Sequence, residues 1–162
     1  MKTFLRALIA LLIVLWLGGV MFFPVVAATA FSSLQDTHAA GTIVGKCLRV
    51  LHYEGLFAGT VIILLLLAAQ QARVYVRHVG LPVIFAFIML ALTAYSQFSI
   101  IPKMEGYRIA AGGAIDAVPA DNPDRVHFNQ LHVTSERVEE GVLVAGLLLV
   151  VSIARLDTFK RP

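Results

Sequence analysis

A set of polar side chains near the C-terminal end of the chain falls on one face of a predicted helix. At 100° per residue they share an arc of about 100°. They are Asn129, His132, Glu136, Glu139 and Glu140. His132 and Glu136 are four residues apart, so they can share a hydrogen bond, hold a proton or supply two ligands to a cation. The spacing therefore predicts a cation or proton site.

Two residues on other predicted helices are expected at the same depth as this face. They are Glu54 and Tyr95. Ionisable groups inside a membrane boundary are costly unless they face the interior of the bundle or water. A plainer interpretation stays open, in which the carboxylates belong to a hydrated helix end among the lipid headgroups.

Metal and haem ligation are weaker alternatives. The candidate soft-metal ligands are scattered without tight spacing, so no metal is assigned. They are His38, Cys47, His52, Met104 and His127. His52 and His132, on different helices, would be the axial pair of a haem-binding redox protein. For the favoured interpretation we expect no cofactor.

Motifs of common catalytic sites are missing from the sequence. There is no Ser-His-Asp order, P-loop, Gly-rich dinucleotide turn or HExxH motif. The single cysteine excludes an intramolecular disulfide and a paired-cysteine metal site. We therefore expect a protein that is not an enzyme.

The composition places these residues in a membrane protein. Of 162 residues, 59% are hydrophobic and 14% are charged, whereas a soluble domain has about 45–50% apolar and about 25% charged residues. The net charge is +3, but the basic residues lie at the ends of apolar runs, which indicates membrane topology and no nucleic-acid partner. The partner expected from composition is the lipid bilayer, and the length fits a single domain over residues 1–162.

Charge-free runs locate the predicted membrane crossings. Residues 7–35, 55–72 and 78–102 each reach the length of about 18–20 residues that spans a bilayer. The fourth run, 141–154, is too short to span a bilayer by itself, so the fourth helix must include charged residues upstream of this run. Asn122 is a good N-cap for this helix, and Pro123 suits its first position.

We therefore expect an all-α integral membrane bundle of four transmembrane helices. The second and fourth helices are long enough to extend beyond the outer face. The expected helices are 5–30, 42–72, 80–102 and 123–155, with an outer loop at 103–122.

The distribution of basic residues predicts that both termini are cytoplasmic, as in a multi-pass protein of the cell membrane such as the bacterial inner membrane. The basic residues assigned to the cytoplasmic side are Lys2, Arg6, Arg73, Arg77, Arg155, Lys160 and Arg161. Residues 1–30 could instead be a signal peptide, because Ala28-Thr29-Ala30 resembles a cleavage site. The apolar run is longer than such peptides use, which favours a retained helix.

Small residues indicate close helix packing. Gly55 and Gly59 form a GxxxG motif, and Gly18 and Gly19 follow Trp16, which is expected in the core because it lies at mid-depth.

Three segments carry a resemblance to a known family. They are Trp16-Leu17-Gly18-Gly19, Gly41 to Glu54, and Phe128 to Ser135. With them the chain resembles the transmembrane-protein-205-like family and, more distantly, the copper-resistance D membrane proteins. The resemblance extends over nearly the whole chain except Gly112 to Asp124. It implies a four-helix membrane bundle and a link to metal tolerance, since human relatives are linked to tolerance of a platinum drug, but it transfers no catalytic residues.

The favoured functional hypothesis is non-enzymatic handling or transport of a small cationic or metal solute near the outer face. His132, Glu136 and Glu140 would bind the cation or relay a proton. The alternative is an accessory subunit that packs against a larger membrane complex through the face of Gly55 and Gly59. A homo-oligomer stays open as a further partner.

Overall fold

The computed structural model describes residues 2–157, and every regular element in that range is helical. The elements are α1 (Lys2–Ser33), α2 (Thr37–Gln71), α3 (Gly80–Tyr95), the π-helical turn η1 (Ser96–Ile100), α4 (Ile101–Ala110), the 3-10 turn η2 (Ile115–Ala117), α5 (Pro123–Ala154) and the 3-10 turn η3 (Arg155–Asp157). The expected all-α class is confirmed for this part of the chain. Lys160 and Arg161, which the sequence analysis assigned to the cytoplasmic side, lie outside the described residues.

Within residues 2–157, three helical segments are long and apolar enough to cross a membrane. They are Lys2–Ser33, Thr37–Gln71 and Gly80–Ala110. Large apolar side chains point outward from all three, among them Phe22, Phe57 and Phe87, as lipid-facing helices require. The charge-free part of α5 is limited to residues 141–154, so α5 is not among the three.

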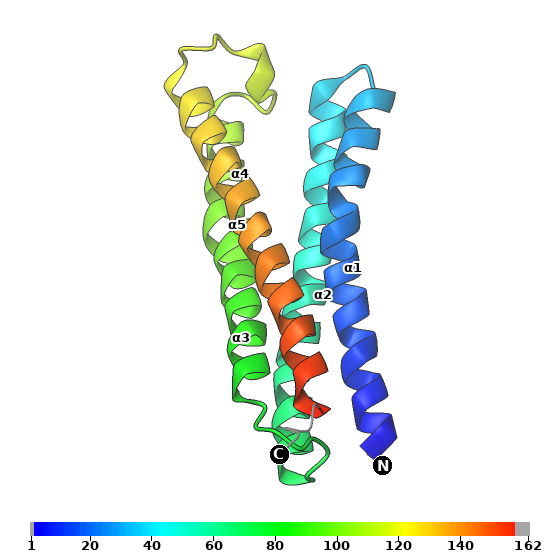
Figure 1. The fold of residues 1–162 in the computed structure, drawn as a ribbon. Coiled ribbons are helices and arrows are strands. Elements are labelled where there is room, and N and C mark those ends of the chain that lie inside the picture. Colours follow the sequence, from blue (N-terminus) through cyan, green and yellow to red (C-terminus); the bar gives the residue numbers. More distant parts are fainter. Residues whose placement is uncertain (1, 158–162) are drawn as a thin grey trace.

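The helices form two antiparallel pairs. Figure 1 shows α1 beside α2 and α5 beside α3 and α4, with the start of α1 and the end of α5 at the same end of the molecule. We call this end the base. The two pairs lie close together at the base and diverge toward the opposite end, which we call the far end (Figure 1).

At the base, the side chain of Arg6 joins three segments. It donates to the carbonyl of Val74 and lies 2.9 Å from Asp157 Oδ1. Its guanidinium carbon also lies 5.0 Å from the centre of the Tyr75 ring. Arg6 therefore connects the first turns of α1 to the α2–α3 loop and to η3.

Buried glycines allow α1 and α2 to approach closely. Trp16 is 1% exposed and lies over Gly55 and Gly59. A Cβ atom added at Gly59 would come within 2.7 Å of Trp16 Cζ3, and one added at Gly19 within 2.6 Å of Leu51 Cδ1. Gly18 differs, because no heavy atom lies within 4 Å of its Cβ position.

The helix ends explain where the structure differs from the predicted boundaries. Asp36 caps α2 by accepting the N–H of His38 at 2.9 Å, so α2 begins five residues before the expected residue 42. Asn122 caps α5 by accepting from Asp124 and Arg125, and α5 begins at Pro123 as predicted.

The largest correction concerns residues 103–110, which were expected in the outer loop and are helical. Pro102 lacks the N–H that would bond to the carbonyl four residues earlier, and its ring crowds that carbonyl. The π-helical turn η1 absorbs this mismatch, with the N–H of Ile101 bonded to the carbonyl of Ser96. The helix then continues as α4 and ends before Gly112 and Gly113, whose φ angles are +82° and +96°.

Candidate functional site

A buried histidine joins three helical elements. His52 of α2 is 1% exposed. Its Nε2 lies 2.8 Å from Oε1 of Glu139 on α5, and its Nδ1 lies 3.1 Å from Oε1 of Gln97 on η1. We call His52, Gln97 and Glu139 the polar trio. Both nitrogens of a buried imidazole are thus satisfied by side chains from other elements.

Helix periodicity places each member of the trio toward the interior. His52 precedes Gly55 and Gly59 on the buried face of α2, and Glu139 lies between buried Ser135 and Val142 on α5. These spacings of three and four residues define one face of a helix. Gln97 follows buried Thr93 and Ser96 on the inward side of α3 and η1.

The hydrogen-bond chemistry of the trio depends on one proton. Both oxygens that face the imidazole are acceptors, so an imidazole with hydrogens on both nitrogens donates to both. A neutral imidazole carries one N–H. The other contact then requires a protonated Glu139, or rotation of the Gln97 amide so that its NH₂ group donates. The trio therefore has satisfied arrangements in two protonation states, which differ by a single proton.

The trio lies in a polar section of the interior. The Glu139 side chain is 19% exposed and that of His52 is 2% exposed. The hydroxyls of Thr93 and Ser96 are also buried there, and neither has a hydrogen-bond partner in the described structure. Buried polar groups without a partner are uncommon in proteins, and each requires a physical explanation.

The elements that carry or adjoin the trio also carry charged residues. These are Arg49 and Glu54 on α2, Glu105 and Arg108 on α4, and Glu136, Arg137 and Glu140 on α5. α1 contributes none, because its sequence has no ionisable residue between Arg6 and Asp36.

The structure separates the residues that were grouped from sequence. His132 Nε2 lies 3.4 Å from Glu136 Oε1, but the two side chains are 58% and 62% exposed. Glu54, Tyr95 and Glu140 are also exposed. Of the six site residues named from sequence, Glu139 is the one that joins the trio.

Sequence reasoning missed both partners of Glu139. His52 was considered as a metal or haem ligand, and Gln97 was not named as a site residue. The sequence did carry a signal for His52, because this residue shares a helical face with Gly55 and Gly59. A helical projection of α2 would therefore have placed His52 toward the interior of the bundle.

The geometry is unfavourable for haem and for a clustered metal site. Both nitrogens of His52 are already hydrogen-bonded, and His132 is paired at the surface. Within residues 2–157 no group of three or more His, Cys, Asp or Glu residues could hold a metal ion. Among the scattered candidates, His127 stacks on Tyr107 at 5.2 Å.

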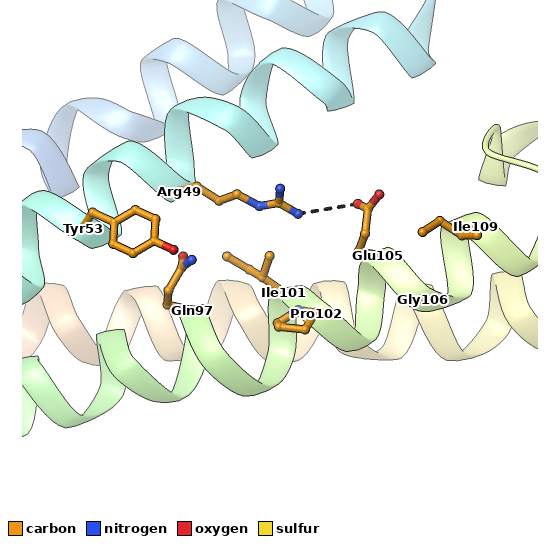
Figure 2. Close-up of a pocket in the computed structure, with 8 residues that line it drawn as sticks. All are labelled: Arg49, Tyr53, Gln97, Ile101, Pro102, Glu105, Gly106 and Ile109. Atoms are coloured by element: carbon orange, nitrogen blue, oxygen red, sulfur yellow. Dashed lines mark ion pairs between the residues drawn. The ribbon is translucent and has the colours of Figure 1, made fainter.

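An open groove of about 450 Å³ lies between α2 and the η1–α4 segment (Figure 2). It is lined by Arg49, Tyr53, Gln97, Ile101, Pro102, Glu105, Gly106 and Ile109. Arg49 and Glu105 form an ion pair across it at 3.6 Å. Figure 2 shows the Tyr53 hydroxyl and the Gln97 amide directed toward one another. One member of the trio therefore borders this groove.

A second groove, also of about 450 Å³, lies between α3 and α5. It is lined by Phe85, Ile88, Leu92, Arg137, Glu140, Gly141, Val144, Ala145 and Leu148. No member of the trio lines it.

The family to which the chain belongs follows from comparison with known proteins. A family model described as a domain of unknown function, DUF4149, matches residues 11–111, which is more than half of the chain. The chain belongs to the DUF4149 family. The matched region includes His52 and Gln97 and ends before Glu139. No curated protein and no solved structure matches the chain, and the two resemblances named from sequence gain no support.

Proposed function

We propose that this DUF4149 protein is a non-enzymatic membrane protein that takes up and releases a proton at His52 and Glu139. The observation that carries this proposal is the 2.8 Å contact between the buried His52 Nε2 and Glu139 Oε1. An ionisable pair inside a membrane-spanning bundle is costly, and such groups commonly form proton or ion pathways.

A proton fits the trio better than a metal ion. The described residues supply two ionisable groups at this place, fewer than the ligands that transition metals ordinarily take from protein side chains. Histidine changes charge near neutral pH more readily than other side chains. The expectation of a small cationic solute thus narrows to H⁺, bound where the imidazole and the carboxylate share it.

The proposed topology has four crossings, with α5 as the fourth. The buried stripe of α5, which includes Val142, Gly146 and Leu149, packs against α1 and α3. A Cβ atom added at Gly146 would meet Leu17 Cδ1 at 2.7 Å and Met89 Cε at 3.1 Å. A helix packed so closely between two apolar spans shares their depth in the bilayer.

In this topology the base is cytoplasmic and the far end, with the outer parts of α2 and α5, faces the outside. Lys2, Arg6, Arg73 and Arg77 lie at the base, in agreement with the excess of Lys and Arg on cytoplasmic ends. The trio then lies in the outer half of the membrane.

The alternative role as an accessory subunit loses its proposed contact surface. Gly55 and Gly59 are covered by Trp16 of the same chain, so this face is filled without a partner.

The proposal is tested by proton uptake after a pH jump in lipid nanodiscs, measured with an indicator dye in weak buffer. Glu139→Gln and His52→Gln keep the size of the side chains and remove the titrating groups. We expect each substitution to lower the number of protons taken up by up to about one per chain, relative to the unmodified protein.

Glu136→Gln is the matched control, since it changes a carboxylate on the same helix that pairs with an exposed histidine. It leaves the contact between His52 and Glu139 intact. Equal uptake between pH 6 and 8 by the unmodified protein, Glu139→Gln and His52→Gln would contradict the proposal.

A further inference from the structure

Gln97 connects the trio to the surface of the molecule. Its Oε1 lies 3.1 Å from His52 Nδ1, and the same side chain lines the groove between α2 and α4. Neither His52 nor Glu139 lines either of the two grooves. Gln97 is therefore the point at which this groove meets the trio.

The groove runs from a charged mouth to this amide. Along the η1–α4 segment Glu105 is eight residues beyond Gln97, a separation of about 12 Å at a helical rise of 1.5 Å. The Arg49 and Glu105 side chains are 44% and 33% exposed, so the mouth is in contact with solvent. In Figure 2 the side chain of Tyr53 lies beside Gln97 at the inner end, on the side away from Glu105.

Glu105 is held in place at the mouth by two cations. Arg108 donates to both of its carboxylate oxygens, at 2.8 and 2.7 Å, and also donates to Thr42 Oγ1 of α2 at 3.3 Å. Arg49 approaches the same carboxylate from α2. These contacts join α2 to α4 across the groove, so they also set its width.

We propose that this groove is the path by which protons from the outer side reach the trio. The inference rests on the proposed function and adds the route. A hydronium ion gives its proton to the His52 nitrogen that faces Gln97 and leaves as water, and the resulting imidazolium donates to both Gln97 and Glu139. Gln97 positions the imidazole at the inner end, and rotation of its amide accommodates the change from one N–H to two.

A competing route would reach Glu139 from the side of α5, because that carboxylate is partly exposed. The second groove lies on the α3–α5 face and includes Glu140, the neighbour of Glu139. Filling each groove separately distinguishes the two routes.

Gly106→Trp fills the proposed path. Gly106 lines the groove, and no heavy atom lies within 4 Å of its Cβ position, so the indole can enter the groove without displacing the helices. Ile109→Trp places an indole at a second, exposed position of the same groove. Val144→Trp is the matched control in the second groove, where Val144 is also exposed.

The readout is the rate and the amplitude of proton uptake after a laser-induced pH jump in nanodiscs. We expect Gly106→Trp and Ile109→Trp to slow uptake severalfold, because each indole fills space in the groove through which protons reach Gln97. The amplitude stays that of the unmodified protein, since the trio is intact. Val144→Trp leaves both quantities unchanged.

Unchanged rates in both groove variants, or slowing in Val144→Trp instead, would overturn the proposed route while leaving the trio as the site of uptake. If uptake by the unmodified protein equals that of Glu139→Gln, the proposed function itself fails.

Discussion

At the residue scale, burial distinguishes two histidine–glutamate pairs of similar composition. The His132–Glu136 pair is exposed to solvent, and exposed pairs contribute about 0–1 kcal/mol to stability. In the His52–Glu139 pair the imidazole is buried, and removal of Glu139 leaves it with one nitrogen lacking a hydrogen bond. Such a loss costs about 1–3 kcal/mol.

The first prediction follows from this difference. Glu139→Ala leaves His52 Nε2 without a partner, so we expect the free energy of unfolding to fall by about 1–3 kcal/mol. Glu136→Ala, on the same helix, changes it by about 0.5 kcal/mol or less. Reversible unfolding in mild detergent measures both variants. Equal losses would show that the buried contact has no special stabilising role.

At the element scale, the close approach of α1 and α2 depends on glycines. Trp16 occupies the space above Gly55 and Gly59, and no side chain can be added at either position without moving its ring. Membrane helices associate largely through such packing, because lipid is as apolar as the side chains.

Gly55→Ala and Gly18→Ala form a matched pair for the second prediction. Gly55→Ala pushes a Cβ atom into the buried Trp16 ring, and overpacking of this kind costs about 1–3 kcal/mol. Gly18→Ala meets open space, and the better helix propensity of alanine favours stability by up to about 1 kcal/mol. Thermal unfolding of the two variants should shift in opposite directions. A loss of stability in Gly18→Ala as large as in Gly55→Ala would contradict the packing described.

The elements also show how far sequence reasoning extends. The apolar runs predicted the α-helices, and Asn122 with Pro123 predicted the start of α5, since these signals are local. Helical periodicity placed Glu139 with His132 and Glu136 on one face of about 100°. It could not show that only Glu139 turns into the bundle, because the rotation of one helix against its neighbours is set by packing.

The η1–α4 segment was missed for a related reason. The third predicted helix ended with its charge-free run at residue 102, but the π turn η1 continues the helix and holds Gln97 toward His52. A π turn inserts a residue into the helical register, and the pattern of apolar residues does not reveal it.

At the scale of the whole molecule, the stability of the base depends on whether the Tyr75 hydroxyl is protonated. Burial raises the pKa of Tyr75 above its ordinary value, Arg6 opposes this shift, and Asp157 adds to it. The folded-state pKa therefore exceeds the unfolded value. The contribution of neutral Tyr75 to stability is fully present below the unfolded pKa of about 10 and is lost as the pH rises through the folded-state pKa.

We therefore expect stability to decline at alkaline pH partly because of Tyr75. In Tyr75→Phe this part of the decline disappears, while the ring remains available to the Arg6 guanidinium. Unfolding measured between about pH 9 and pH 11 compares the two proteins. The same slope in both would show that Tyr75 does not determine the alkaline behaviour of the base.

The proposed topology gives a further prediction for the molecule as a whole. In a Cys47→Ser background, a cysteine at Asp121 should react with a membrane-impermeant maleimide in intact cells, because the α4–α5 loop faces outward. A cysteine at Arg73, in the α2–α3 loop, should react only after the cells are opened. The reverse pattern would place the base outside.

The most direct test of the proton site is the ¹⁵N NMR spectrum of His52 in nanodiscs, assigned by comparison with His52→Gln and followed between about pH 5 and pH 8. We expect His52 to change between imidazole and imidazolium signals, and this change to move in Glu139→Gln but not in Glu136→Gln. A His52 signal that is the same at every pH, or unaffected by Glu139→Gln, would contradict the assignment of His52 and Glu139 as the proton-binding pair.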